Sequence, residues 1–239
     1  MNKNIDILKK YAEDNNIFLA SDVYEKLCIY GDLLREWNEK INLTAITEPK
    51  EIVIKHFADS LSILKYMPKT SGKKLIDIGS GAGFPGMVLK IARPDLSVTL
   101  ADGHAKRFVF LNVLEKELGT QFKTENVHAR AEILGQDPDF RESFDFVTAR
   151  AVARLNVLCE YCFPLVKNNG IFISMKGPDA ENELKEASLA ISLLGGSAEP
   201  LFFETLPNNE KRINIVIKKI SQTPPKYPRT SAKIARQPL

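Results

Sequence analysis

The alternation of two sequence patterns from residue 73 onward constrains the fold more than any other feature. Short apolar runs alternate there with stretches of helical spacing. A chain that repeats strand and helix builds right-handed βαβ units, in which helices cover both faces of a parallel sheet. The predicted strands are Lys74–Ile78, Ser97–Ala101, Thr124–His128, Phe144–Thr148 and Ile171–Met175. The predicted helices are Pro85–Ala92, Ala105–Leu118, Leu155–Val166 and Ala180–Leu194.

The last two apolar segments, Leu201–Leu206 and Ile213–Ile220, break this alternation. Only residues 207–212 lie between them. A crossover between parallel strands needs about a dozen residues or more, so these two strands are expected to pair antiparallel as a hairpin. The sequence therefore predicts a mostly parallel sheet that ends in an antiparallel hairpin.

The first part of the chain, residues 2 to about 66, has a helical pattern instead. Leu27, Tyr30, Leu34 and Trp37 recur at three- and four-residue spacing and form one apolar stripe. We therefore expect an N-terminal helical extension over residues 1–70, an α/β core over residues 71–220 and a basic tail over residues 221–239.

Composition and charge narrow the class of protein. A net charge of +3 on 239 residues does not by itself indicate a nucleic-acid partner, but residues 218–239 carry six Lys or Arg and no Asp or Glu. This tail favours an acidic partner or a solubilising end. No apolar run approaches the roughly 18 residues that cross a bilayer, and no signal peptide is evident, so a cytoplasmic protein is expected.

The glycine-rich segment Asp77–Gly86 follows the first predicted strand. Counting from Gly81 gives G-x-G-x-x-G, the dinucleotide fingerprint. Counting from Asp77 gives D-x-G-x-G-x-G, the loop of S-adenosylmethionine (SAM)-dependent methyltransferases. The second interpretation is preferred because it places Gly79 directly after the strand, where glycine lets a ligand approach the backbone.

Polar residues at the ends of the next strands support a nucleoside site. Asp102 lies 23 residues after Gly79, near the offset of about 20 at which an acid binds a ribose diol. Arg130–Glu132 ends the third strand and could recognise an adenine edge. Arg150 and Arg154 follow the fourth strand, where an alternative role is surface ion pairing. Ligands of open α/β sheets bind at these strand ends.

Two further groups have competing interpretations. His56, Asp59 and Ser60 fall on one helical face, and a structural histidine is as plausible there as a pocket-lining one. Cys159 and Cys162 form a C-x-x-C pair inside a helical pattern without a second pair, so two packed thiols are favoured over a zinc or redox site. No metal site is predicted.

Several motifs together resemble one known family, the bacterial 16S rRNA (guanine-N7)-methyltransferases of the RsmG/GidB type. The matching segments are Trp37–Thr44, His56–Ser60, Asp77–Gly86, Arg130–Glu132, Thr148–Ala153, Lys176–Gly177 and Lys226–Arg229. They extend from about residue 28 to residue 229. Gly103–His104 departs from the family, which usually has Ser or Ala after the ribose acid.

The resemblance implies an α/β, Rossmann-like class I SAM-dependent methyltransferase fold with an N-terminal helical extension. It implies SAM as methyl donor and, as acceptor, the guanine at conventional position 527 in the 530 loop of 16S rRNA, on naked RNA or in the small ribosomal subunit. A monomer without a membrane partner is expected. The implied SAM-binding residues are Asp77, Gly79, Gly81, Gly83, Phe84, Asp102, Ala131, Glu132 and Arg150. The implied substrate-binding residues are Asn42, His56, Asp59, Ser60, Lys176, Arg212, Lys226 and Arg229.

The chemistry of guanine N7 fits a site without a general base. N7 carries an unprotonated lone pair, so the enzyme can work by position and orientation. A-form RNA hides this edge in a narrow groove, so the guanine is expected in a loop or extruded. Arg150 and Arg154 are the candidate catalytic residues, which would hold the guanine or its phosphate. Two other functions stay open: a nicotinamide-dependent oxidoreductase, and an RNA- or ribosome-binding protein with an idle pocket.

Overall fold

The computed structural model describes residues 1–239, apart from the side chain of Asn2. In the described chain, eight strands form one sheet in the order β3-β2-β1-β4-β5-β8-β6, and β7 pairs with β8. The strands are β1 (Lys74–Ile78), β2 (Ser97–Asp102), β3 (Glu125–His128), β4 (Phe144–Arg150), β5 (Val166–Lys176), β6 (Gly196–Ala198), β7 (Phe202–Thr205) and β8 (Lys211–Lys219).

The strands β1 to β5 are parallel, as the strand–helix alternation predicts. Each neighbouring pair is in parallel register, for example Asp77 of β1 beside Thr148 of β4. The next strand, β8, runs antiparallel to β5. Because the five strands share one direction, their carboxyl ends lie at one edge of the sheet, the edge at which ligands of open α/β sheets bind.

The predicted hairpin is confirmed, and a short strand was missed. β7 pairs antiparallel with β8, with Phe203 beside Ile213. β6 also pairs antiparallel with β8, at its far end. Its sequence, Gly-Ser-Ala, has no apolar alternation, so its strand geometry depends on the neighbouring strand rather than on its own residues.

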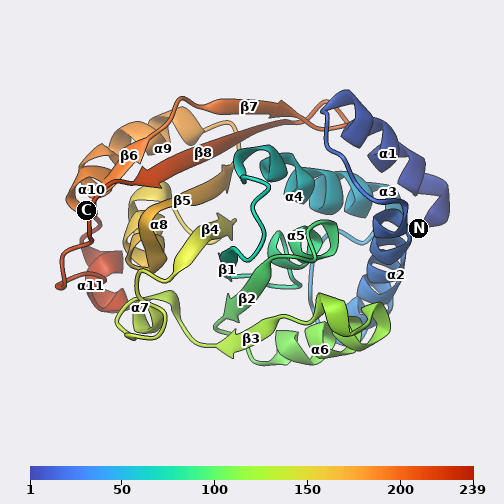
Figure 1. Ribbon diagram of the computed structural model, residues 1–239, viewed down its shortest axis with the longest axis horizontal. Helices are drawn as coiled ribbons and strands as arrows, with labels where there is room; N and C mark the ends of the chain where they lie inside the picture. The colour runs from blue at the N-terminus through green and yellow to red at the C-terminus, as the bar shows by residue number, and fades with distance from the viewer.

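Helices cover both faces of the sheet (Figure 1). On one side lie α1 (Ile5–Asp14), α2 (Ser21–Asn38), α5 (Gly86–Ala92) and α6 (Lys106–Leu118). On the other lie α7 (Ala131–Leu134), α8 (Leu155–Cys162), α9 (Ala180–Glu186), α10 (Ser188–Leu193) and α11 (Ser231–Arg236). The buried apolar residues accordingly form two clusters, one on each side of the sheet.

Two predicted helices are shorter than expected. The helix predicted over Leu155–Val166 ends at Cys162, followed by a 3-10 turn over Phe163–Leu165, and Val166 already begins β5. Pro164 explains the end, because proline lacks the N–H that an α-helix needs. The helix predicted over Ala180–Leu194 is divided into α9 and α10 at Ala187, whose ψ of −2° departs from the α-helical value of about −42°.

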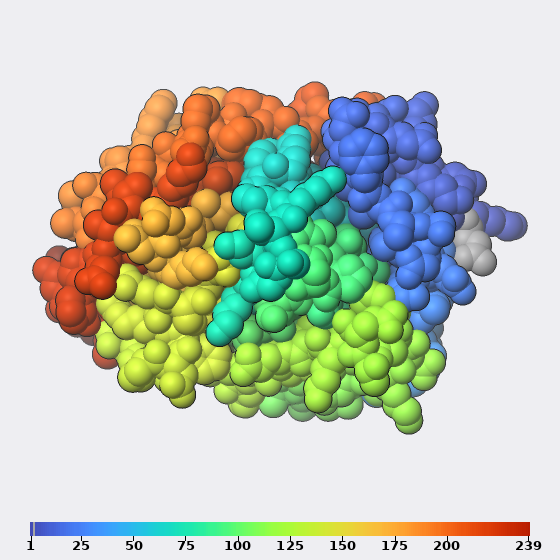
Figure 2. All heavy atoms as spheres, in the orientation of Figure 1, coloured from blue at the N-terminus to red at the C-terminus, as the bar shows by residue number. Residues whose placement is uncertain are grey.

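The N-terminal segment is helical in separate pieces rather than continuously. After α2, residues 39–48 are irregular, and helical structure resumes with α3 (Pro49–Ile52), a π-helical turn (Val53–Ala58), α4 (Asp59–Leu61) and a 3-10 turn (Ser62–Tyr66). In the space-filling view the teal chain before β1 lies between the blue N-terminal helices and the yellow and orange C-terminal half (Figure 2).

Tyr30 joins this segment to the core. Its wholly buried ring stacks on Phe84 at 5.1 Å, and its hydroxyl donates a hydrogen bond to the carbonyl of Ala82 in the glycine-rich loop. The apolar stripe predicted on α2 is thus confirmed as a packing face, with Leu27, Tyr30 and Leu34 buried. Because of this contact, the loop rests on the N-terminal helices as well as on the sheet.

We expect Tyr30→Phe to lower the free energy of unfolding by about 1–3 kcal/mol, because it leaves the buried Ala82 carbonyl without a donor. Urea denaturation followed by circular dichroism measures this. Tyr24→Phe, on the half-buried part of the same helix, is the control. Equal stability of Tyr30→Phe and the wild type would contradict the role given to this hydroxyl.

Candidate functional site

Two adjoining cavities lie at the carboxyl ends of the parallel strands. The larger, of about 630 Å³, is lined by residues from β4, β5 and the helical segment before β1, and we call it the basic cleft. The smaller, of about 180 Å³, includes Asp102 and is called here the Asp102 pocket. Val152 lines both. The site therefore has room for two ligands with one residue between them.

The glycine-rich loop has the backbone that its sequence predicts. Gly79, Gly81 and Gly83 have φ of +70°, +59° and +99°, a region that favours glycine. A Cβ at Gly79 would lie 2.6 Å from the Val152 side chain, so glycine is also required by close approach at the junction of the two cavities. Gly79 itself lines the Asp102 pocket.

The side chain of Asp77 fixes the end of this loop. Its wholly buried carboxyl accepts hydrogen bonds from the Gly86 N–H and the Thr148 hydroxyl, both at 2.9 Å. Burial raises the pKa of Asp77 to about 7, although these two hydrogen bonds oppose the shift. Asp77 was predicted to bind the cofactor. Its carboxyl is instead buried against the loop, so it can act on a ligand only indirectly, by positioning the loop backbone.

Asp102 presents a carboxylate to the smaller cavity. It accepts hydrogen bonds from the N–H groups of Gly81 (2.9 Å) and His104 (2.8 Å), and from the Arg107 guanidinium (2.6 Å). Burial alone would raise the pKa of Asp102, but these donors outweigh it and the pKa lies below its usual value. The residue is thus an ionised acceptor. The Gly103–His104 departure from the family keeps a backbone donor on this carboxylate.

The other walls of the Asp102 pocket combine apolar and polar groups. The predicted residues Ala131 and Glu132 line it, together with Ile78, Ala101 and Ala129. Two lining residues were missed by the sequence analysis, Tyr161 of α8 and Ser231 of α11. Tyr161 lies within the C-x-x-C segment and Ser231 lies two residues after the Lys226–Arg229 motif, but the expectation that ligands bind at strand ends pointed to neither.

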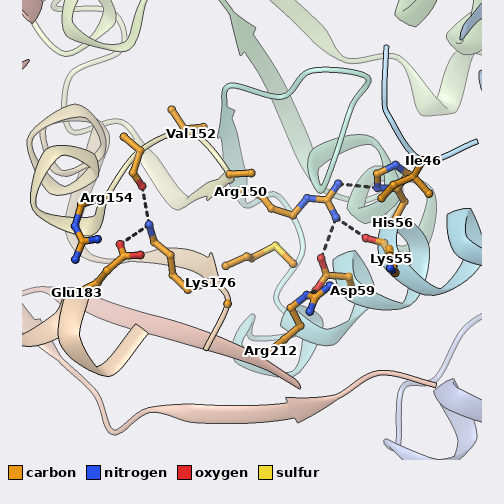
Figure 3. A pocket seen from close by; sticks show the side chains of 14 residues that line it. Ile46, Lys55, His56, Asp59, Arg150, Val152, Arg154, Lys176, Glu183 and Arg212 are labelled. Carbon is orange, nitrogen blue, oxygen red and sulfur yellow. Dashed lines mark hydrogen bonds and ion pairs between the residues drawn. The ribbon is translucent and has the colours of Figure 1, made fainter. Parts of the chain in front are cut away.

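The basic cleft brings together most of the other predicted residues (Figure 3). Its lining residues include Lys55, His56, Asp59, Arg150, Arg154, Lys176, Glu183 and Arg212. Cations outnumber the two carboxylates, so the cleft is suited to an anionic ligand. Ala151 begins the connection between Arg150 and Arg154 with a left-handed backbone, φ 56°, which is uncommon for a residue other than glycine.

Arg150 is the centre of a buried network in this cleft. Its guanidinium donates to the Asp59 carboxylate (3.0 Å), the Lys55 carbonyl (3.0 Å) and His56 Nδ1 (3.1 Å), as Figure 3 shows. It also lies over the Phe84 ring, 5.2 Å from the centroid, and Phe84 stacks on His56 at 4.2 Å. The structure thus joins into one cluster the residues that the sequence analysis selected separately.

His56 is neutral in this cluster. Burial, followed by the charge of Arg150, lowers the pKa of His56 to about 3. Because Arg150 can only donate, His56 Nδ1 is assigned as an acceptor, and Nε2–H then donates to the Thr44 hydroxyl at 2.9 Å. The π-helical turn around His56 fits this role, since such turns occur frequently at functional sites.

Thr44 and Asn38 support His56, although no individual role was predicted for either from the sequence. The Asn38 side-chain oxygen accepts from the N–H groups of Leu43 (2.8 Å) and Thr44 (2.9 Å), which fixes the loop that carries the Thr44 hydroxyl. Both belong to the Trp37–Thr44 motif. The motif itself was therefore the only sequence feature that pointed to these two residues. Its polar residues Asn38 and Thr44 shape a loop and support His56.

The other cations of the cleft differ in how firmly they are held. Arg154 is half exposed and pairs with Glu186 (2.7 Å) and Asp179 (3.5 Å), exposed partners that hold it weakly. Lys176 is nearly buried, and its ammonium donates to the Ala153 carbonyl (2.6 Å) and pairs with Glu183 (2.7 Å). Arg154 is thus the cation most able to turn toward a ligand.

Four predicted substrate residues lie outside these walls. Asn42 lines a separate groove with His104, and Lys226 lies beside Tyr227 on the C-terminal segment. Arg229 pairs with the wholly buried Glu160 at 2.6 Å. Within the described residues, the buried Ser60 hydroxyl finds no hydrogen-bond partner. Their substrate-binding roles stay predictions.

Cys159 and Cys162 are wholly buried free thiols, in agreement with two packed side chains. Apart from the undescribed side chain of residue 2, the chain holds no group of three or more His, Cys, Asp or Glu arranged for a metal ion. In the same part of the chain, every helix is too short or too polar to cross a membrane.

Comparison with known proteins gives the site a context. A family model described as rRNA small subunit methyltransferase G matches residues 23–214. A ribosomal RNA small subunit methyltransferase G from Desulfitobacterium hafniense is 49% identical over 225 residues, which cover 94% of this chain and 92% of that protein. Its namesake from Bacillus subtilis is 45% identical over 237 residues, 99% of each chain.

Solved structures of low sequence identity share the fold. A 16S rRNA (adenine(1408)-N(1))-methyltransferase from Catenulisporales acidiphilia has a TM-score of 0.51 at 13% identity, over 64% of this chain and 88% of that one. The [4+2]-cyclase SpnF has a TM-score of 0.54 at 14% identity, over 68% and 81%. The predicted fold class is confirmed, and the cyclase shows that this fold by itself does not determine the reaction.

The buried Asp77 predicts a pH dependence of stability. Because its pKa is raised on folding, protonated Asp77 stabilises the folded state at low pH, and this contribution is lost as the pH rises through about 7. Asp77→Asn stays neutral, so we expect the stability of the variant relative to wild type to increase by on the order of 2 kcal/mol from pH 5 to pH 8. Urea denaturation at both pH values measures it, and a pH-independent difference would contradict this titration.

Proposed function

The chain belongs to the rRNA small subunit methyltransferase G family, and we propose that it transfers a methyl group from SAM to N7 of a guanine in 16S rRNA. The guanine is that at conventional position 527, in the 530 loop. The observation that carries this proposal is the pair of adjoining cavities, one with an ionised carboxylate beside a glycine-rich loop and the other lined by cations.

The Asp102 pocket fits the adenosine end of SAM. Its ionised carboxylate lies at the end of β2 and can accept from ribose hydroxyls, with Arg107 as the partner most easily displaced. Ile78, Ala101 and Ala129 offer apolar contact to the base. Gly79 lines this pocket without a side chain, so a ligand can approach its backbone. The residues that would hold SAM are therefore Asp102, Gly79 and the Ala131–Glu132 segment.

SAM supplies an electrophilic methyl group on a positively charged sulfonium. Guanine N7 has a free lone pair, so no side chain has to remove a proton from it. The work of this chain is then to exclude water and to hold the guanine beside the boundary between the two cavities. The neutral His56 and the fully engaged Arg150 suit such a positioning role, because neither is required to change protonation.

The charges of the basic cleft fit both the RNA and the product. Arg154, Lys176 and Arg212 can contact phosphate groups beside an extruded guanine. Methylation at N7 leaves a positive charge on the purine. Asp59 and Glu183, the carboxylates that line the cleft, can offset this charge. The cleft therefore holds an anionic backbone and a cationic base with different groups.

The family assignment favours methyl transfer over the two functions that the sequence analysis left open, a nicotinamide-dependent oxidoreductase and an idle RNA-binding protein. Thermal-shift measurements with SAM, S-adenosylhomocysteine, NAD and NADP separate these functions. We propose that a monomer acts in the cytoplasm, where small subunits are assembled. Stabilisation by the nicotinamides alone would overturn the proposal.

Mapping of the modified base tests the proposed function directly. Purified protein is incubated with methyl-labelled SAM and with naked 16S rRNA, assembly intermediates or the complete small subunit. Nuclease digestion and mass spectrometry then locate the label. We expect 7-methylguanosine in the 530 loop. Label in another base, or at another atom of guanine, would reject the proposed acceptor.

Asp102→Ala is expected to weaken SAM binding by about 1–3 kcal/mol, because ribose hydroxyls lose their acceptor. Isothermal titration calorimetry measures the affinity. Asp139→Ala, which removes an exposed carboxylate beyond α7, is the control. Equal SAM affinity of Asp102→Ala and wild type would reject the ribose contact.

Arg154→Ala is expected to raise the KM for RNA about tenfold and to leave the SAM affinity unchanged, because an exposed cation that leaves weak surface partners can contact phosphate. Initial rates at varied RNA concentration measure this. Lys185→Ala removes an exposed cation of α9 outside the cleft and serves as the control. An unchanged KM for RNA would remove Arg154 from the binding surface.

A further inference from the structure

The C-terminal segment that follows β8 is folded against the body of the protein. Tyr227, Pro228 and Ile234 are buried in it. The Arg141 guanidinium holds its backbone, donating to the carbonyls of Thr223 (2.9 Å) and Tyr227 (2.8 Å). A segment whose sequence suggests only a basic tail therefore has one defined path.

The strongest anchor of this segment is the pair of Arg229 and Glu160. Glu160 is wholly buried in α8, and its carboxylate accepts from the Arg229 guanidinium at 2.8 and 2.6 Å and from the Arg229 N–H at 2.8 Å. A buried carboxylate with a two-pronged arginine partner fixes geometry more tightly than a surface ion pair does. A second contact holds the preceding residue, where Gln136 donates to the Pro228 carbonyl at 2.7 Å.

Each residue of this ion pair has a near neighbour in sequence that lines the Asp102 pocket. Tyr161 follows Glu160 in α8, and Ser231 lies two residues after Arg229, at the start of α11. Both line the Asp102 pocket, on which Ala131 and Glu132 also border. The two residues of the ion pair are thus each within two positions of a residue that lines the cavity.

We propose that the C-terminal segment is a built wall of the cofactor site, in which Ser231 contacts the adenosine end of SAM and the Arg229–Glu160 pair is a positioning pair. This inference rests on the proposed function, since it assigns the wall of the same pocket. Ser231 supplies a hydroxyl that can both donate and accept, and Tyr161 supplies an aromatic ring beside it.

In this proposal the basic segment shapes the cofactor pocket, a role that does not depend on its exposed positive charges. Lys226 and Lys233 are exposed, whereas Arg229 is turned inward to Glu160. Breaking the wall should therefore change the use of SAM, whereas removing the exposed charges should leave the affinity for SAM as it is. These two effects can be measured separately in the full-length protein.

The experiment compares Ser231→Phe with Thr230→Phe. Phe at position 231 would occupy part of a cavity of about 180 Å³, whereas Thr230 is the exposed residue directly before it. Calorimetry with SAM on the full chain is expected to show about tenfold or greater loss of affinity for Ser231→Phe and less than about twofold for Thr230→Phe. Thermal unfolding of each variant shows whether the fold is retained.

Arg229→Lys tests the positioning pair with a charge-conserving change, since Arg229→Ala would leave Glu160 buried without a partner. Lysine cannot form the two-pronged contact, so we expect the KM for SAM to rise about three- to tenfold while kcat and the KM for RNA change less than about twofold. A merely structural role would lower thermal stability without this selective effect on SAM.

The outcomes distinguish this proposal from the proposed function. If wild type binds SAM and a folded Ser231→Phe binds it equally well, the wall is rejected while the methyltransferase function stands. A general loss of stability in Arg229→Lys with unchanged KM for SAM rejects the positioning pair. If wild type binds no SAM, both proposals fail together. Loss of SAM affinity in Ser231→Phe, with the affinity of Thr230→Phe unchanged, supports the proposal that Ser231 forms part of the cofactor site.

Discussion

The guanidinium of Arg150 joins two parts of the chain that are far apart in sequence. It extends from the end of β4 and donates to Asp59, to His56 and to the carbonyl of Lys55 in the helical segment before β1. A sheet with helices on both faces does not require that segment at its carboxyl edge. With Arg150 in place the helical segment becomes a wall of the basic cleft, so the cleft depends on this one side chain.

The two cavities divide the charges of the reaction between them. The Asp102 pocket presents an ionised carboxylate, which the backbone N–H groups of Gly81 and His104 hold in place. The basic cleft offers cations, of which Arg154 is loosely held and Lys176 firmly. A site of this kind catalyses by holding partners in place, in agreement with a reaction that moves no proton.

Much of the fold was predictable because hydrophobic period and turn chemistry act locally. The parallel strands, the hairpin and the left-handed glycines follow from such patterns. The site was predictable only in part: Asp102 and Arg150 end strands, whereas Tyr161 and Ser231 line the pocket from α8 and α11, and no strand-end pattern predicts them. Pro164 ended a helix that periodicity alone extended, since a local backbone rule overrode the apolar pattern.

Ala151 lines the basic cleft and adopts a left-handed backbone directly before Val152, the residue that lines both cavities. An L-residue gives up about 1 kcal/mol in this conformation, which glycine would adopt without cost. Such a bend persists only where its neighbours leave the chain no alternative, here Arg150 on one side and the buried Leu155 on the other. The boundary between the two cavities is thus preorganised: its shape is set by folding, before any ligand binds.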